Sequence, residues 1–332
     1  MTHTHKKQIY MAPLEGITKY IYRNAHQQVF GNITKYFAPF IDARINRPLK
    51  SRELHDLLPE NNQNLSLIPQ IMTNDSEAFL ATAKQLEEIG YHELNLNLGC
   101  PSLTVVRKNR GAGFLSNPET LKQFFQNVYE DSSFASKDMK LSVKTRLGME
   151  SPEEMHTLIA IYNAFPLHEL IIHPRVQTDY YRNTPDLDSF AFIQKESHIP
   201  LVYNGDLNTV SDVAALSKRF PDEHTLMLGR GLIRNPALSR ELSSHEINYT
   251  EPAAMQNTLT KKEFLTFHDT IFHGYQELLS GEIPVLHKMK ELWSYWIFNF
   301  KDAKKPYKAL NKSQHFKEYE TQVNILFENH FR

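Results

Sequence analysis

Short apolar segments, most of which do not alternate with polar residues, recur along the first 231 residues of the chain. Segments of this kind, mostly closed by Gly, Pro or Asn, are typical of parallel strands that are buried on both faces. The pattern predicts eight strands, at Ile9–Ala12, Tyr36–Phe40, Leu67–Met72, Glu93–Leu98, Leu141–Leu147, Glu169–His173, Leu201–Asn204 and Thr225–Leu228.

Segments with helical periodicity lie between these strands. Ser76–Ile89 begins with a potential capping serine and carries apolar residues three and four positions apart, and Asn117–Tyr129 begins with an Asn-Pro pair. Eight strands that alternate with helices over about 240 residues predict an α/β fold, a (β/α)8 TIM barrel, for residues 1–245. A doubly wound open sheet is the alternative, although it usually has fewer strands.

The pattern changes after the barrel. Residues 246–258 are polar and contain a proline, which indicates a linker. Residues 259–332 are helical in pattern and rich in aromatic side chains, without strand-like segments. We therefore expect a small all-helical domain to follow the barrel.

Composition narrows the class of protein. The 332 residues are 41% hydrophobic and 23% charged, and no segment approaches the roughly 20 apolar residues of a membrane-spanning helix. The first apolar segment is too short for the core of a signal peptide. The single cysteine, Cys100, excludes an intramolecular disulfide and a Cys-rich zinc site, and the 16 histidines show no persuasive ligand spacing. We expect a cytoplasmic protein without a metal, with no protein partner indicated and a monomer by default.

Charge is balanced over the chain but uneven along it. The formal net charge is −1, whereas residues 288–317 hold eight lysines and two acids, interleaved with aromatic residues such as Trp293 and Trp296. Two interpretations are open. The lysines and aromatics bind the phosphates and bases of a nucleic acid, or they form a solvated lysine face over an aromatic core.

Polar residues follow nearly all of the predicted strands. The active site of a TIM barrel forms at the carboxyl ends of its strands, so these residues are expected to converge on one rim. They are Ala12-Pro13-Leu14-Glu15-Gly16, Pro69-Gln70, the segment Asn95–Pro101, Lys144-Thr145-Arg146, His173-Pro174-Arg175, Asn204-Gly205-Asp206 and Gly229-Arg230-Gly231.

The last two segments indicate a phosphate site. Glycine turns after strands 7 and 8, each followed by a helix, commonly bind phosphate through backbone N–H groups. The alternative is a pair of ordinary turns, because Asn-Gly is a common turn pair. No Gly-x-Gly-x-x-Gly motif follows a strand, so a resident dinucleotide has no Rossmann site. If the chemistry is redox, we expect a tightly bound cofactor that carries a phosphate.

These segments together resemble the tRNA-dihydrouridine synthase family. The resemblance rests on Ala12–Thr18, Asn95–Pro101, Arg110–Leu115, Val143–Arg146, Ile172–Arg175 and the two glycine turns, which occur in the family's order and approximate spacing. It spans residues 8–245, and the helical C-terminal domain is similar in kind. Leu14 stands where the family usually has Met, and Pro174 stands where it has Gly. Because proline lacks a backbone N–H, Pro174 leaves the role of His173 open.

The resemblance implies FMN-dependent reduction of uridine to 5,6-dihydrouridine in tRNA, with NADPH as the reductant. Reduced flavin supplies a hydride to C6 of uracil and an acid supplies a proton to C5, and Cys100 corresponds to the family's acid. The implied FMN-binding residues are Pro13, Leu14, Glu15, Gln70, Lys144, His173, Asn204, Gly205, Asp206, Gly229 and Arg230. The implied substrate-binding residues are Asn97, Arg146, Arg175, Lys304, Lys305 and Lys308.

Other interpretations stay open at this point. Cys100 can be a buried apolar residue, as lone cysteines usually are, and the basic residues at the strand ends can form ion pairs with Glu15 and Asp206. A related FMN barrel enzyme acting on a free pyrimidine needs no RNA domain. The chain can also be an RNA-binding relative that has kept the barrel and lost catalysis, which would bind RNA without flavin. A uridine inside folded RNA must leave the fold to react, and the barrel rim has room for one base only. If the chain acts on tRNA, we therefore expect the helical domain to bind the body of the tRNA through its phosphates.

Overall fold

The computed structural model describes residues 7–135, 139–243 and 258–332, so residues 246–257 of the predicted linker lie outside it. Ten strands form one sheet in the order β3-β5-β6-β7-β8-β9-β10-β1-β2-β4. They are β1 (Gln8–Met11), β2 (Lys35–Phe37), β3 (Ile41–Asp42), β4 (Leu67–Ile68), β5 (Gln70–Met72), β6 (Glu93–Leu98), β7 (Lys140–Gly148), β8 (Leu170–Val176), β9 (Leu201–Tyr203) and β10 (Thr225–Leu228).

The sheet closes into a barrel of eight strands, two of which are interrupted. The pairs β2 with β3 and β4 with β5 are consecutive pieces of single barrel strands, and Pro39 and Pro69 lie in the gaps. Proline cannot donate to a strand ladder, so it breaks the pairing locally. The parallel pairings β2–β4 and β3–β5 then join the two ends of the strand order. The prediction of an eight-stranded parallel barrel is therefore confirmed, with two of the predicted strands split.

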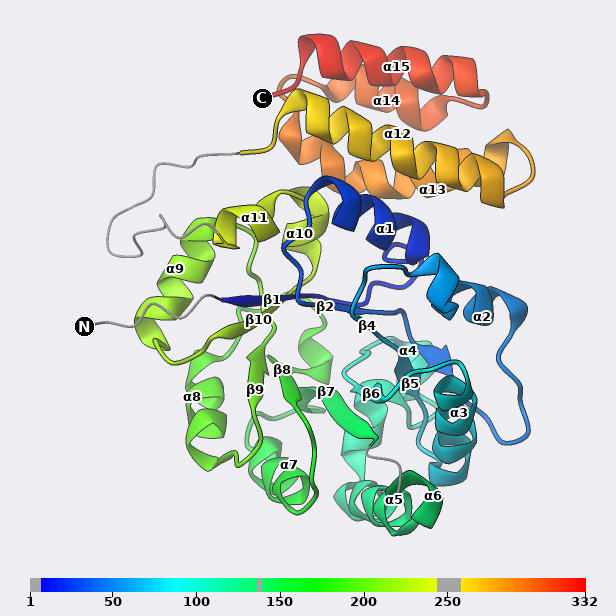
Figure 1. The fold of residues 1–332 in the computed structure, drawn as a ribbon. Coiled ribbons are helices and arrows are strands. Elements are labelled where there is room, and N and C mark those ends of the chain that lie inside the picture. Colours follow the sequence, from blue (N-terminus) through cyan, green and yellow to red (C-terminus); the bar gives the residue numbers. More distant parts are fainter. Residues whose placement is uncertain (1–6, 136–138, 244–257) are drawn as a thin grey trace.

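Helices surround the barrel (Figure 1). They are α1 (Tyr20–Val29), α2 (Ser51–Leu57), α3 (Ser76–Glu88), α4 (Leu103–Val106), α5 (Pro118–Glu130), α6 (Ser132–Ala135), α7 (Glu154–Asn163), α8 (Leu187–Glu196), α9 (Val210–Arg219), α10 (Arg230–Arg234) and α11 (Leu238–Ser243), with 3-10 turns η1 (Pro59–Asn61), η2 (Gly111–Ser116) and η3 (Gln177–Asp179). The cap of α3 differs from the prediction. Asp75, not Ser76, is its N-cap and accepts a hydrogen bond from the Ala78 N–H, because a carboxylate one residue earlier satisfies the free amide.

Apolar side chains fill the inside of the barrel and the space between strands and helices. The inner cluster consists of Tyr10, Ala12, Phe37, Ile68, Ile171, Val202 and Met227. Where the strands begin, charged groups close the barrel: the Tyr10 hydroxyl donates to Glu169 at 2.7 Å, and the Lys35 ammonium contacts Glu93 and Glu169 at 2.7 and 3.0 Å. The opposite end, where the strands finish, stays open for a site.

A layer of four helices follows the barrel, namely α12 (Lys261–Leu278), α13 (Glu282–Trp296), α14 (Lys304–Lys312) and α15 (Phe316–Asn329), with a 3-10 turn η4 (Ile297–Asn299). In Figure 1, α12 and α13 lie between the barrel and the outer pair α14 and α15. Trp293 and Trp296 are fully buried in its core. For these two aromatics the structure supports the core interpretation rather than base stacking.

The helical layer packs tightly on α1. The ring centroid of Phe267 lies 5.3 Å from that of Tyr22 and 5.3 Å from that of Phe30. At Gly274 a Cβ atom would lie 2.9 Å from the Ile21 side chain, so glycine lets α12 approach α1 closely. This contact places α13 beside the open rim of the barrel.

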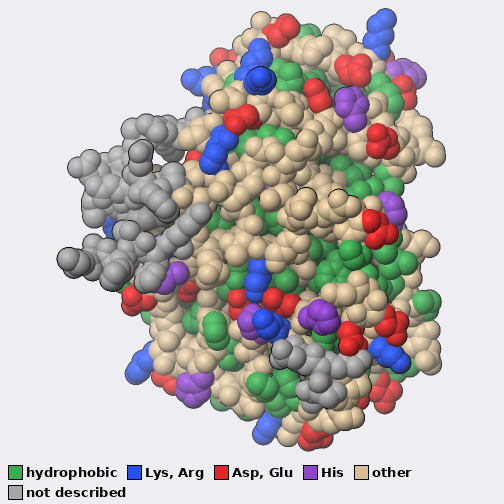
Figure 2. Space-filling view, in the orientation of Figure 1, with side chains coloured by type: hydrophobic (Ala, Val, Ile, Leu, Met, Phe, Trp, Pro, Cys, Tyr) green, Lys and Arg blue, Asp and Glu red, His purple; other side chains and the backbone are tan. Residues whose placement is uncertain are grey.

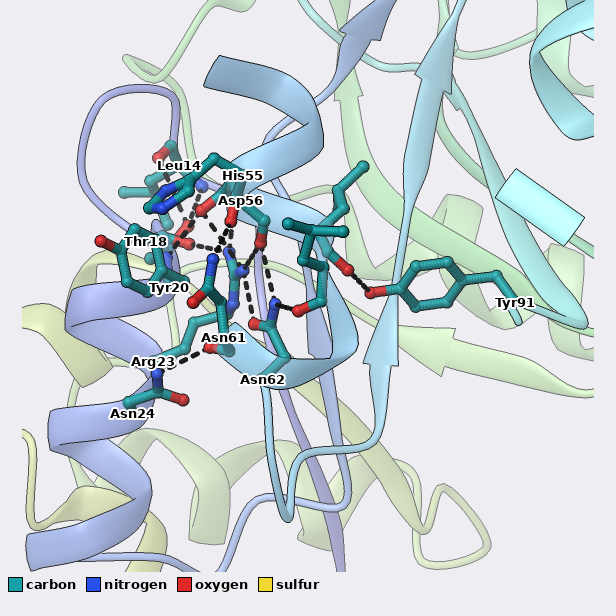
Figure 3. A network of polar contacts seen from close by, with 12 residues as sticks. Leu14, Thr18, Tyr20, Arg23, Asn24, His55, Asp56, Asn61, Asn62 and Tyr91 are labelled. Carbon is teal, nitrogen blue, oxygen red and sulfur yellow. Dashed lines mark hydrogen bonds and ion pairs between the residues drawn. The ribbon is translucent and has the colours of Figure 1, made fainter. Parts of the chain in front are cut away.

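A buried ion pair fixes the loop between β1 and α1 (Figure 3). Arg23 is 0% exposed, and its guanidinium contacts the Asp56 carboxylate at 3.3 Å and donates to the Thr18 carbonyl at 2.7 Å. The Thr18 hydroxyl in turn accepts a hydrogen bond from the Leu14 N–H at 2.8 Å. The network ties the loop that carries Leu14 to α2. Within the described segments, no helix combines the length and the apolar character that crossing a bilayer requires.

Candidate active site

A cavity of about 520 Å³ opens at the carboxyl ends of the strands. All of the residues predicted to bind FMN line it, together with Asn97, Cys100 and Arg146. Arg175, Lys304, Lys305 and Lys308 do not line it. The barrel therefore brings together segments that are far apart in sequence, from the end of β1 to the start of α10.

Asn97 shapes the turn that carries Cys100. Its side-chain oxygen accepts hydrogen bonds from the Gly99 and Cys100 N–H groups at 3.0 and 2.9 Å. Its amide group donates to the Gln70 side chain at 2.7 Å, and Gln70 donates to Asn95 at 2.7 Å. A chain of buried amides thus anchors the cysteine turn to the barrel interior. Gln70 keeps one amide hydrogen and Asn97 one amide hydrogen for a ligand.

Gly111 packs directly against the cysteine turn. Its φ is +54°, and a Cβ atom there would lie 2.9 Å from both the Cβ and the carbonyl oxygen of Cys100. The next residue, Ala112, donates its N–H to the same carbonyl at 3.1 Å. The position of Cys100 therefore depends on the absence of a side chain at residue 111.

We predict that Gly111→Ala displaces Cys100 and lowers the rate of the chemical step by about 10- to 100-fold, because sub-ångström placement governs such rates. Gly281→Ala is the matched control, since Gly281 also has a positive φ (+86°) but has no atom within 4 Å of the added Cβ. The control variant should lose stability without losing rate. Single-turnover rates of the two folded variants check this, and equal rates would contradict it.

Electrostatics keep the Cys100 thiol protonated. Burial raises its pKa above the ordinary value, while the Ser102 N–H and the charges of Arg146 and Lys144 oppose that shift. A thiol with a raised pKa carries its proton at neutral pH and can donate it. Cys100 is half-buried and faces the cavity, so the position is not that of a core cysteine.

Lys144 lines the same cavity with an unsatisfied ammonium group. Loss of hydration lowers the pKa of Lys144 to about 7, and the charge of Arg146 adds to this shift. Within the described segments, its side chain makes no hydrogen bond and no ion pair, so the alternative of an ion-pair network does not hold for Lys144. A buried cation without a partner favours an anionic or electron-rich ligand.

Arg146 links the cysteine turn to the loop after β8. Its guanidinium donates to the Gly99 carbonyl at 2.9 Å, the Val176 carbonyl at 2.9 Å and the Tyr180 carbonyl at 2.7 Å. These bonds use three of its five donor hydrogens, so two are left for other partners. Arg146 is only 1% exposed, and it therefore holds the site together whether or not it also contacts a substrate.

Arg175 does not line the cavity but contacts two residues that do, near the two glycine turns. It is 1% exposed, pairs with Asp206 and donates to the His173 Nε2 at 2.9 Å. Because arginine can only donate, Nε2 must accept, and the neutral ring then carries its proton on Nδ1. Burial and nearby cations hold the pKa of His173 well below its usual range, which agrees with a neutral ring. We infer that Arg175 positions His173 and Asp206 instead of contacting the substrate, as the ion-pair interpretation proposes for this residue.

The comparisons with known proteins identify the family of this chain. A family model for dihydrouridine synthases matches residues 10–330. The chain belongs to the dihydrouridine synthase family. This confirms the family predicted from the sequence, and with it the enzyme class, a flavin-dependent oxidoreductase.

Individual relatives have low sequence identity to this chain, but the matches cover most of its length. The tRNA-dihydrouridine(16) synthase of Pseudomonas syringae pv. tomato is 28% identical over 71% of this chain and 75% of its own. The tRNA-dihydrouridine synthase B of Shewanella oneidensis is 25% identical over 72% of each chain. A solved structure of morphinone reductase has a TM-score of 0.50 and 11% identity, and the match covers 71% of this chain and 86% of that one. The last match shows a shared fold only.

In this dihydrouridine synthase family member, the structure adds residues to the site that the sequence did not indicate. Tyr181, from the loop after β8, lines the cavity, and its ring centroid lies 4.8 Å from the Arg230 guanidinium. Glu291 and Tyr295 of α13 line the cavity from the helical layer. No strand-end pattern marks these three residues. The spacing of four between Glu291 and Tyr295 indicates only a shared helix face.

The lysine-rich surface of the helical layer lies away from the cavity lining. Lys304, Lys305 and Lys308 are exposed on α14. Two other lysines of the stretch are used internally: Lys288 donates to the Gly16 carbonyl at 3.1 Å, and Lys290 donates to the Ser313 carbonyl at 2.6 Å. On the face shown in Figure 2, acidic and basic side chains are interspersed.

One group of potential metal ligands exists among the described residues. Glu93, His168 and Glu169 have ligand atoms within 4.8 Å of one another. They lie where strands β6 and β8 begin, at the end of the barrel opposite to the cavity. The Lys35 ammonium contacts both carboxylates there, so these charged groups close this end of the barrel.

Proposed function

We propose that the chain reduces uridine to 5,6-dihydrouridine in tRNA, with bound FMN that is reduced by NADPH. One observation supports this most: the Cys100 thiol and the Lys144 ammonium face one cavity whose walls carry every residue predicted to bind FMN. The relatives from Pseudomonas syringae and Shewanella oneidensis are both named for dihydrouridine formation in tRNA. A cytoplasmic location and a monomeric state stay predictions.

The residues of the cavity fit FMN. The unpartnered Lys144 ammonium offers a cation to the polar edge of a flavin ring, and Gln70 offers an amide hydrogen. On the opposite side, no hydrogen bond of the described residues uses the backbone N–H of Gly205 or Arg230. Free amides beside an arginine suit a phosphate, so Asn204, Gly205, Gly229 and Arg230 would hold the ribityl phosphate.

The protein's own contribution is a proton and its placement. Bound and reduced, FMN supplies the hydride for C6 of the uracil. The Cys100 Sγ–H bond breaks and a C–H bond forms at C5, which leaves a thiolate. Arg146 and Lys144 stabilise that thiolate, because their charges act to lower the pKa of Cys100. The thiolate takes a proton from water before the next turnover.

The purified, flavin-loaded protein tests the proposal with unmodified transcribed tRNA and with free uridine. Dihydrouridine in the tRNA and none from free uridine is the expected result. Reduction of a free pyrimidine would favour the small-molecule oxidoreductase, and tRNA binding without flavin uptake would favour an inactive RNA-binding relative. Parallel reactions with NADPH and NADH decide between the two reductants.

We propose that α14 holds the tRNA body through phosphate contacts. Replacement of Lys304, Lys305 and Lys308 by Ala should weaken tRNA binding and flatten its salt dependence, by about 0.9 in the slope of log K against log salt for each phosphate that is no longer neutralised. The matched control is Lys84→Ala/Lys122→Ala/Lys195→Ala, which removes three exposed lysines from α3, α5 and α8. An unchanged slope in the α14 variant would remove this helix from RNA binding.

A further inference from the structure

A second, smaller cavity adjoins the catalytic one. The two cavities share Glu15, Pro39 and Phe40 in their walls. The side cavity has a volume of about 150 Å³, which equals the liquid volume of about five water molecules. That is room for a phosphate group. Its remaining wall comes from the N-cap of α1, from β3, and from α2 with the residue that precedes it.

Most carboxylates in this wall are neutralised by other parts of the barrel. Three of the four acids already have arginine partners, so they add little negative potential to the cavity. The pairs are Asp42 with Arg44 and Arg110, Glu53 with Arg47, and Asp56 with Arg23. Glu15 is the one acid of this wall without an ion pair among the described residues.

Three cations face the side cavity without such partners. Lys19, Lys50 and Arg52 all line it, and none of them forms an ion pair within the described residues. Lys19 is half-buried, while Lys50 and Arg52 are exposed. Loss of hydration raises the pKa of Glu15, and Lys19 and Arg52 are the leading charges that oppose this shift, so both lie near the wall shared with the catalytic cavity. The unpaired charges are thus three positive and one negative.

We propose that the side cavity binds one backbone phosphate of the RNA, on a nucleotide adjacent to the target uridine, through Lys19 and Arg52. The proposal rests on the proposed function, because a uridine that enters the catalytic cavity brings its flanking phosphates to the mouth. Arg52 can offer paired N–H donors to phosphate oxygens, and Lys19 offers a point charge. Contacts of this kind fix the register of a nucleic acid without reading its bases.

A double-mutant cycle between protein and RNA tests this. The two partners are the full-length holoenzyme, as wild type or Lys19→Ala/Arg52→Ala, and tRNA joined from synthetic fragments with one neutral methylphosphonate on either side of the target uridine. We expect about a tenfold weaker affinity from the protein change, and the same loss from the methylphosphonate at one of the two positions. The combination should cost no more than either change alone. The salt slope should become shallower by roughly 0.7 in the double variant.

The control variant Lys84→Ala/Lys122→Ala removes two exposed lysines from α3 and α5 and should bind like wild type. Circular dichroism confirms that each variant is folded. Unchanged affinity in Lys19→Ala/Arg52→Ala, or losses that multiply with the methylphosphonate at both positions, would overturn the phosphate site. Because the cycle measures binding, it is independent of turnover. A wild-type protein that binds tRNA but forms no dihydrouridine would contradict the proposed function and not this site.

Discussion

Cys100→Ala should lower the rate of dihydrouridine formation by about 10²- to 10⁴-fold, the usual contribution of a positioned general acid. The thiol is the one group in the cavity wall that combines a raised pKa with a position fixed by two hydrogen bonds to its turn. Removal of the sulfur leaves C5 without a proton donor. The affinities for tRNA and FMN should not change, since neither the phosphate side nor Lys144 is altered.

Single-turnover reactions of the reduced protein with tRNA measure this effect. Because burial raises the pKa of Cys100, the thiol is protonated at neutral pH, and the wild-type rate should fall as pH rises through that raised value. The variant should lose the part of this decline that follows the thiol and keep the part that follows Lys144, whose pKa is lowered to about 7. A variant with the wild-type rate, or with an unchanged alkaline decline, would show that another group supplies the proton.

Asp56→Ala should lower the free energy of unfolding by about 3 to 5 kcal/mol, because it leaves the Arg23 charge buried without its carboxylate. Asp56 also accepts a hydrogen bond from the Tyr20 N–H at 2.7 Å, so the start of α1 loses a partner too (Figure 3). The Thr18 and Leu14 backbone would loosen with it. We therefore expect weaker FMN binding as a secondary effect.

Urea unfolding followed by fluorescence measures the change. The control is Asp188→Ala, which breaks a surface ion pair with Arg219 in which the Asp188 side chain is 93% exposed. Such pairs contribute at most about 1 kcal/mol. A loss for Asp56→Ala no larger than that of the control would mean that the buried ion pair does not stabilise the native state.

The barrel could be predicted because its strands are buried on both faces. Continuous apolar segments such as Leu170–Ile172 have few alternative structures, and glycine or proline marks where many of the strands end. The catalytic rim could be predicted for the same reason, because parallel strands place their carboxyl ends together. The splits at Pro39 and Pro69 follow from the missing N–H of proline, which a pattern of hydrophobicity does not register.

The residues that the sequence did not indicate come from tertiary contacts. Tyr181 reaches the cavity through an irregular loop, and Tyr295 reaches it because α12 packs on α1 and carries α13 to the rim. The family resemblance implies that Arg175 binds the substrate, and this stays a prediction; in the structure its guanidinium pairs with Asp206 and contacts His173. The periodicity of hydrophobic residues predicts neither the direction of a side chain nor how the helical layer packs on the barrel.

The dihydrouridine content of tRNA from cells that lack this chain tests the central claim most directly. The account predicts that dihydrouridine disappears from one or a few positions, returns with the wild-type gene and does not return with Cys100→Ala. Unchanged dihydrouridine at every position, in cells without a second family member, would contradict it.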